Sequence, residues 1–194
     1  MTKLSLVQQA HQAIEAVLKP GDITIDATVG NGHDTLFLAM QVGATGKVYG
    51  FDIQQEALDS AYLRLQQAGQ TAQVSLYHAG HEVMAMVLPG SVAGKVKAVM
   101  FNLGYLPGGD KQRTTDTSTT LAALQTSLSL LASGGMIAVL AYTGHPGGRE
   151  EAELVKGWAA SLPQDLFSLS IEVPPSERGN APEWLVIRRL EVEP

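Results

Sequence analysis

Two hydrophobic periods alternate along the chain, and they predict its secondary structure. Apolar residues spaced by three or four positions are typical of amphipathic helices, and short continuous apolar runs are typical of strands buried on both faces. The helical spacing predicts helices at residues 4–18, 33–40, 58–68, 121–131 and 150–160. The apolar runs predict strands at residues 23–27, 47–52, 73–77, 96–101, 136–140, 167–173 and 184–190.

This order of elements predicts an α/β fold. Strands that alternate with helices of about ten or more residues form a mostly parallel sheet with helices on both faces. No helix is predicted between the last two strands, so we expect them to pair antiparallel. The 194 residues suit one domain and contain no repeat or linker. We therefore expect one domain over residues 1–194, with a first helix in 1–20 and a seven-stranded, doubly wound core in 21–194.

Composition narrows the class of protein. Hydrophobic residues make up 45% and charged residues 16%, which excludes a disordered or coiled-coil chain. The absence of cysteine excludes disulfides and thiolate metal sites. No apolar run is long enough to cross a membrane, and the first residues lack the apolar stretch of a signal peptide, so we expect a cytoplasmic domain. Thirteen basic and 19 acidic residues give a net charge of −6, which argues against nonspecific binding of nucleic acid.

A glycine-rich turn follows the first predicted strand, with the sequence Asp-Ala-Thr-Val-Gly-Asn-Gly-His-Asp-Thr at 26–35. Gly30 and Gly32 allow the backbone to bend tightly and to approach a ligand. The second strand ends at Asp52, whose carboxylate can accept hydrogen bonds from both hydroxyls of a ribose. This order predicts a nucleoside site, and the structural alternative is a tight turn with a surface aspartate.

The same turn favours S-adenosylmethionine (SAM) over NAD. A dinucleotide site has a third glycine where this chain has Thr35, and its pyrophosphate requires positive potential. Asp34 places a negative charge there instead. The carboxylates of Asp26 and Asp34 would attract a cation, and SAM carries an ammonium and a sulfonium.

The fourth predicted strand ends in Phe-Asn-Leu-Gly-Tyr-Leu-Pro-Gly-Gly-Asp-Lys, residues 101–111. The Asn102 side-chain oxygen and the Leu103 carbonyl can accept hydrogen bonds from a substrate amine, and Tyr105 offers a ring for stacking a base. A locally capping asparagine is the structural alternative. The segment resembles the Asn/Asp-Pro-Pro-Tyr/Phe motif of amino-group methyltransferases, with Leu103 and Gly104 in place of the prolines.

Together with Tyr-Thr-Gly-His-Pro-Gly-Gly at 142–148, these segments resemble a family of bacterial class I methyltransferases formerly described as rRNA methylases. Its better-defined members are tRNA 5-aminomethyluridine methyltransferases, and the resemblance covers essentially the whole chain. It implies a Rossmann-like fold and SAM-dependent N-methylation of 5-aminomethyl-(2-thio)uridine at the tRNA wobble position. Three alternatives stay open. The protein could methylate rRNA or a small amine, it could be a non-enzymatic module that binds SAM or a nucleotide, or it could be an NAD-dependent oxidoreductase.

The motifs assign roles to individual residues. We expect the cofactor to be bound by Asp26, Thr28, Gly30, Asn31, Gly32, His33, Asp34, Thr35, Asp52, Ile53, Gln54, Gly80, His81 and Asn102. The catalytic residues are expected to be Asn102, Leu103 and Tyr105. The substrate, an anticodon stem-loop of tRNA, is expected to contact Tyr105, Asp110, Lys111, Arg113, Tyr142 and His145.

Three further questions concern protons, metals and partners. The general base could be Asp110, His145, His81 or solvent. We expect no metal, because the histidine spacings match no metal-binding pattern. His11 lies on the apolar face of the first helix and is interpreted as a core or interface residue. Lys111, Arg113 and Arg149 could form a local basic surface for RNA, and the sequence leaves a homodimer open.

Overall fold

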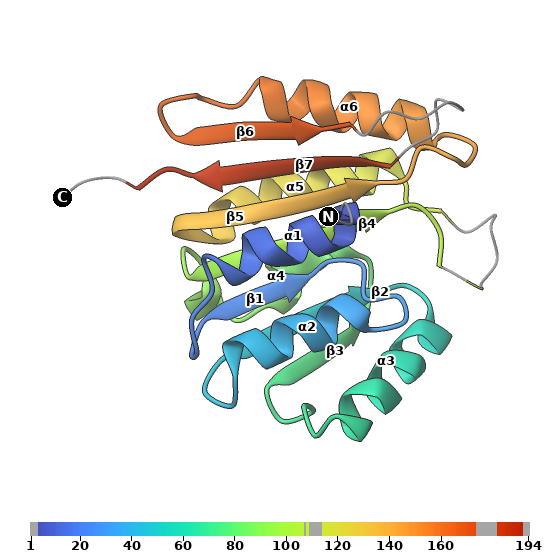
Figure 1. Cartoon of the computed structure of the whole chain (residues 1–194), viewed down its shortest axis with the longest axis vertical. Helices are drawn as coiled ribbons and strands as arrows, with labels where there is room; N and C mark the ends of the chain where they lie inside the picture. The colour runs from blue at the N-terminus through green and yellow to red at the C-terminus, as the bar shows by residue number, and fades with distance from the viewer. Residues whose placement is uncertain (1–3, 107, 109–113, 174–181, 192–194) are drawn as a thin grey trace.

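A single seven-stranded sheet organises the computed structural model, which describes residues 4–106, 108, 114–173 and 182–191. Within these residues the strand order is β3-β2-β1-β4-β5-β7-β6. All neighbours pair in parallel except β7, which is antiparallel to both β5 and β6, as expected (Figure 1). The strands are β1 (Ile23–Asp26), β2 (Lys47–Asp52), β3 (Val74–His78), β4 (Val96–Leu103), β5 (Leu131–Ala141), β6 (Phe167–Glu172) and β7 (Glu183–Arg189).

Helices cover both faces of the sheet. In Figure 1, α1 and α2 lie in front of the strands and α5 lies behind them. The helices are α1 (Leu6–Glu15), α2 (His33–Val42), α3 (Gln55–Gln67), α4 (Met84–Val87), α5 (Thr117–Leu130) and α6 (Gly148–Ala160). Two short 3-10 turns, His81–Val83 and Gly90–Val92, flank α4. This is the doubly wound α/β architecture that the hydrophobic periods predict.

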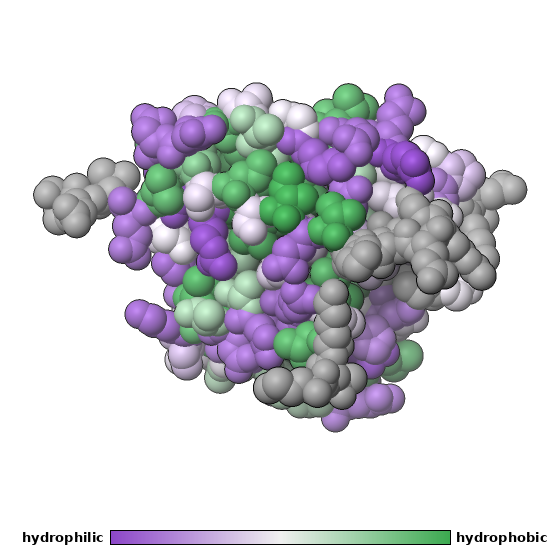
Figure 2. All heavy atoms as spheres, turned by 45° about the horizontal axis from the view of Figure 1, so that its top comes forward, coloured by the Kyte–Doolittle hydropathy of each residue, from purple (hydrophilic) through white to green (hydrophobic). Residues whose placement is uncertain are grey.

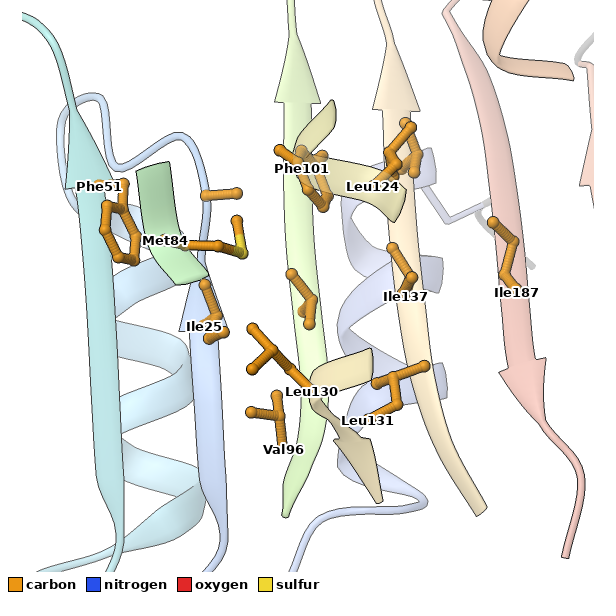
Figure 3. Packing of buried hydrophobic residues seen from close by; sticks show 14 of the residues in the cluster. Ile25, Phe51, Met84, Val96, Phe101, Leu124, Leu130, Leu131, Ile137 and Ile187 are labelled. Carbon is orange, nitrogen blue, oxygen red and sulfur yellow. The ribbon is translucent and has the colours of Figure 1, made fainter. Parts of the chain in front are cut away.

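Each face of the sheet has its own hydrophobic core. On one face, Leu6, Ala10 and Ile14 of α1 and Leu38 of α2 pack against the strands. On the other face, the side chains of α4 and α5 meet those of the central strands (Figure 3), where Met84 and Leu124 lie among Ile25, Phe101 and Ile137. The central strands are buried on both faces, which explains why their sequences are continuously apolar.

The junction between α5 and β5 differs from its prediction. The spacing of leucines predicts a helix that includes Leu131, but α5 ends at Leu130 and Leu131 is extended, with φ −63° and ψ 134°. Leu131 is fully buried and pairs with Val96. A single leucine satisfies both the helical period and a buried strand, so the pattern alone could not separate the two.

The surface is mixed in polarity. Figure 2 shows hydrophilic side chains over most of one face, with a group of hydrophobic side chains near its middle. Exposed apolar residues at or beside the edge strand β6 include Leu166, Ile171 and Val173. Across the described ranges, every helix is too short or too polar to span a lipid bilayer.

Candidate functional site

Two cavities adjoin one another at the carboxyl ends of β1, β2 and β4. The first has a volume of about 360 Å³ and the second about 670 Å³. Thr28, Gly30, Asn102, Gly104 and Tyr105 line both cavities and so lie at their junction. The carboxyl ends of parallel strands are where ligands bind in open α/β sheets, so this pair of cavities is the candidate site.

The turn between β1 and α2 uses its two glycines for different purposes. Gly30 (φ +50°) lines both cavities, and its backbone faces them without a Cβ. Gly32 (φ +76°) lines neither cavity. A Cβ there would lie 2.6 Å from the Cα of Ala61 in α3, so Gly32 is required for helix packing. Packing alone thus explains the glycine at position 32, and its contact with the cofactor stays a prediction.

Asp52 at the end of β2 is held by two backbone amides. Its Oδ2 accepts a hydrogen bond from the Gly30 amide at 2.8 Å, and its Oδ1 accepts one from the Gln54 amide at 2.9 Å. The carboxylate lines the first cavity and retains further lone pairs. It can therefore accept hydrogen bonds from ligand hydroxyls, as the sequence predicts.

Asp26 supports the turn from the interior of the protein. It is completely buried and lines neither cavity. It accepts hydrogen bonds from the hydroxyl of Thr35 at 2.6 Å and from the amide of Thr28 at 3.2 Å. Burial, reinforced by the negative charge of Asp34, raises the pKa of Asp26 to about 7. Asp26 and Thr35 therefore brace the turn from within, and their predicted contact with the cofactor stays a prediction.

Asn102 has a fixed side-chain orientation. Its Nδ2 donates to Oδ2 of Asp34 at 2.7 Å, and its backbone amide donates to the Thr28 hydroxyl at 2.7 Å. Because a carboxylate can only accept, the amide must present its NH₂ group to Asp34. The NH₂ group of the Asn102 side chain is therefore used by Asp34, and its Oδ1 is the atom that can accept a hydrogen bond from a ligand at the junction of the cavities.

The loop after β4 is fastened by a buried carboxylate. Glu151 of α6 is 2% exposed and accepts hydrogen bonds from Thr115 at 2.6 Å and from Thr120 at 2.8 Å. The Thr115 hydroxyl in turn accepts a hydrogen bond from the Gly104 amide at 3.0 Å, and the Thr115 amide donates to the Gly104 carbonyl. Glu151 thus links α6 to the residues that follow Asn102.

Two histidines that were considered as bases lie on different cavities. His81 lines the first cavity, and its Nδ1 donates to the Ala27 carbonyl at 2.9 Å. Burial lowers the pKa of His81. His145 lines the second cavity, its Nδ1 donates to the Pro146 carbonyl at 3.0 Å, and its Nε2 is buried without a hydrogen-bond partner. Of these two histidines, only His145 lines the cavity that also contains Asp34 and Tyr142.

Most of the expected site residues line one or both cavities. Leu103 does not: its side chain is buried and its carbonyl accepts the Tyr142 amide at 2.9 Å, which leaves one lone pair of that oxygen, so its catalytic role stays a prediction. Asp110, Lys111 and Arg113 lie outside the described residues. In the first cavity are Thr28, Gly30, Asp52, Ile53, Gln54, Gly80, His81, Asn102 and Tyr105; in the second are Thr28, Gly30, Asn31, His33, Asp34, Asn102, Tyr105, Tyr142 and His145.

Sequence reasoning missed Glu82, which lines the first cavity, and Val7 of α1, which lines the second. Asp116 also lines the first cavity, and from the sequence it is interpreted as part of a helix start. The Thr-Thr-Asp-Thr run at 114–117 does carry a signal, since Asp116 caps α5 by accepting the amides of Ser118 and Thr119. Glu151 gives no such signal, because a glutamate in a first helical turn is common. Among the described residues, no three His, Asp or Glu side chains cluster as metal ligands would.

Comparison with solved structures identifies the fold. A protein from Clostridium thermocellum described as an rRNA methylase superposes with a TM-score of 0.92 at 37% identity, covering 98% of this chain and all of that one. A methyltransferase from Streptococcus mutans, solved in complex with SAH, gives a TM-score of 0.86 at 31% identity, covering 97% and 100%. The chain therefore has the Rossmann-like fold of class I methyltransferases.

Sequence comparison gives two kinds of relative. The chloroplastic tRNA (mnm(5)s(2)U34)-methyltransferase of Arabidopsis thaliana is 43% identical over 162 residues, which is 79% of this chain and 58% of that protein. Ribosomal RNA small subunit methyltransferase H of Streptococcus mutans is 32% identical over 95 residues, or 48% and 30% of the two chains. This chain thus spans less than two thirds of the length of either relative. The model of the family described as "Putative rRNA methylase" matches residues 48–189, and the chain belongs to that family.

Proposed function

We propose that this protein is a SAM-dependent N-methyltransferase that converts 5-aminomethyl-(2-thio)uridine at the wobble position of tRNA to the methylaminomethyl form. One observation carries the proposal: Asn102, with its side-chain oxygen available to a ligand, stands at the junction of two adjoining cavities. One cavity suits a nucleoside cofactor and the other suits the substrate. The resemblance to the Arabidopsis tRNA methyltransferase supports the choice of substrate.

The first cavity fits SAM better than NAD. Asp52 offers acceptors for ribose hydroxyls, and Gly30 leaves room for a close approach. The carboxyl groups of Asp52, Glu82 and Asp116 line the cavity, and none of its described lining residues is a lysine or arginine. This negative environment favours a cationic ligand and opposes a pyrophosphate. The related Streptococcus mutans structure contains SAH, the product that SAM leaves after methyl transfer.

The second cavity fits an aromatic base that carries an amine. Tyr105 and Tyr142 are exposed and line it, so a nucleobase can stack against either ring. Asp34 gives the cavity a carboxyl group toward which an aminomethyl group could point. Tyr105 and Gly108, both in the loop after β4, line this cavity.

When bound, SAM would supply a methyl group on a positively charged sulfur. The chain's own task is then to hold a neutral amine in line with that methyl group. The Asn102 oxygen can accept one N–H of the amine, which directs the nitrogen lone pair away from Asn102. A primary alkylamine has a pKa of about 10 and must lose a proton first. We propose that this proton passes to water or to Nε2 of His145.

The decisive experiment incubates the purified protein with SAM and tRNA that carries aminomethyluridine, and then analyses the nucleosides by mass spectrometry. The proposal expects a mass gain of one methyl group on that nucleoside alone. Methylation of ribosomal RNA or of a free alkylamine in place of tRNA would redirect the substrate assignment. Failure to methylate any of them would favour a binding module.

Cofactor binding is tested separately by calorimetry in EDTA. Asp52→Ala should weaken SAM binding by about 1–3 kcal/mol, because the ribose hydroxyls would lose their acceptor. Asp59→Ala, an exposed residue of α3 that lines neither cavity, is the matched control and should bind SAM as the wild type does. Tighter binding of NAD than of SAM would contradict the cofactor assignment.

A further inference from the structure

We propose that His11, on the N-terminal helix α1, is a positioning residue for methyl transfer that acts through Asp34 on Asn102. The inference rests on the proposed function, because it concerns the amide that would orient the substrate amine. It also goes beyond the sequence reading of His11 as a core or interface residue. The model of the family begins at residue 48, so α1 lies outside the matched segment.

Three side chains form a continuous chain of hydrogen bonds. His11 Nε2 lies 2.6 Å from Oδ1 of Asp34, and Oδ2 of Asp34 accepts Nδ2 of Asn102 at 2.7 Å. The three residues come from α1, α2 and β4, which are distant in sequence. Asp34 and Asn102 both line the second cavity, whereas His11 does not. His11 thus reaches the candidate site only through Asp34.

The position of the His11 ring is itself fixed. It stacks on Phe37 with ring centroids 3.9 Å apart and an angle of 1° between the planes. Helix α1 is held by its buried face of Leu6, Ala10 and Ile14 and by a capping box at Ser5. A ring that stacks on Phe37 and is carried by an anchored helix can direct its Nε2 hydrogen at one carboxylate oxygen without further ordering.

This chain of contacts decides which atom Asn102 presents to the substrate. An asparagine amide can turn over, exchanging its oxygen for its NH₂ group, unless its partners allow only one orientation. Asp34 enforces that orientation only while its carboxylate stays in place, and the His11 hydrogen bond holds the opposite oxygen. His11 Nε2 can donate whether the imidazole is neutral or protonated, so loss of the donor is the informative change.

A structural alternative is that His11 and Asp34 simply fasten α1 to α2. Asp34 lies in the first turn of α2, where a negative charge is favourable to the helix in any case. The alternative predicts a loss of stability with no specific effect on Asn102. The positioning role predicts that removing the donor matters only when Asn102 is present.

Two variants distinguish the positioning role from a purely structural role of His11. His11→Phe keeps a flat ring to stack on Phe37 but removes the donor, and His11→Gln restores an N–H donor without the ring. We expect His11→Phe to lower the single-turnover methylation rate at saturating SAM by about 10-fold, the scale of losing a supporting contact behind a functional group. SAM affinity should be unchanged, and His11→Gln should recover most of the rate.

A double-mutant cycle and NMR complete the test. In an Asn102→Ala background, His11→Phe should cause no further loss of rate. In the free protein, the side-chain amide signals of Asn102 should shift and exchange faster in His11→Phe than in the wild type. Equal further loss with and without Asn102, or unchanged Asn102 signals, would overturn the inference. Lack of any methylation by the wild type would instead overturn the proposed function, and the NMR comparison would still test the positioning role.

Discussion

At the scale of single residues, the proposed chemistry depends on Asn102. Its oxygen would contact the amine most strongly when the nitrogen is neutral and attacking. Losing a contact made mainly in the transition state lowers kcat and kcat/KM together. Asn102→Ala should therefore slow single-turnover methylation by roughly 100-fold or more, with little change in SAM affinity. Wild-type rates in this variant, measured on aminomethyluridine tRNA, would leave Asn102 as a turn residue only.

Asp26 makes a prediction about stability that is independent of catalysis. Burial and the charge of Asp34 raise its pKa from 3.8 to about 7, so between these values the folded protein holds a proton that the unfolded chain has lost. The free energy of unfolding should then fall as the pH rises, by at most about 1.4 kcal/mol per pH unit. Its contribution is fully present below pH 3.8 and lost by about pH 7.

Asp26→Asn isolates this contribution. The asparagine side chain can still accept the hydrogen bond from the Thr28 amide and can form a hydrogen bond with the Thr35 hydroxyl, but it does not titrate in this pH range. Urea unfolding between pH 4.5 and 7.5 should show the variant gaining stability relative to the wild type as the pH rises. Parallel pH profiles of the two proteins would mean that Asp26 is ionised in the folded state.

At the scale of elements, the fastening of α6 to the loop after β4 is the least expected feature. Thr115→Val removes the hydroxyl that accepts the Gly104 amide and that donates to Glu151. Leaving such buried groups unpaired costs about 1–3 kcal/mol of stability. Because Gly104 lies two residues after Asn102, the residue proposed to orient the amine, we also expect slower methylation, measured in single turnover at a temperature where the variant is folded.

Thr120→Val is the matched control for this prediction. It removes the other hydrogen bond to Glu151 but lies within α5 and lines neither cavity. We expect a similar loss of stability in urea and a nearly unchanged methylation rate. Equal rates in the two threonine variants would show that the fastening of the loop has no part in the reaction.

The limits of sequence prediction also lie at this scale. Strong periods located every strand and the five long helices. The junction at Leu131 was misassigned because one leucine fits two periods, and the short helix α4 was not predicted because four residues are too few to show a period. The turn at 26–35 was predicted to be part of a ligand site and borders both cavities, but the sequence did not show which of its side chains face the interior of the protein. Asp26 and Asp34 look equivalent in the sequence, and strand β1 buries the first while helix α2 presents the second. Contacts such as that of His11 with Asp34 join distant segments and leave no local pattern.

At the scale of the whole molecule, a net charge of −6 constrains how tRNA could bind. Affinity for RNA depends largely on neutralising phosphates, so an acidic protein needs its basic residues gathered beside the site. Lys111 and Arg113 lie outside the described residues, but in the sequence they fall between Leu106 and Thr114, which both line the first cavity. Their position in the chain makes them the candidates for contact with the RNA backbone.

Changing Lys111 and Arg113 together to alanine should weaken the binding of all tRNAs to a similar extent, because contacts with phosphates do not depend on the base sequence. The slope of log K against log salt should flatten by about two, one for each lost contact. SAM affinity should stay the same, since no described cation lines the first cavity. Lys19 and Lys95 precede β1 and β4, at the opposite ends of the strands from the cavities, and their double alanine variant is a control matched in charge. If both double variants flatten the slope equally, long-range charge rather than a local contact governs binding, and the RNA surface lies elsewhere on the molecule.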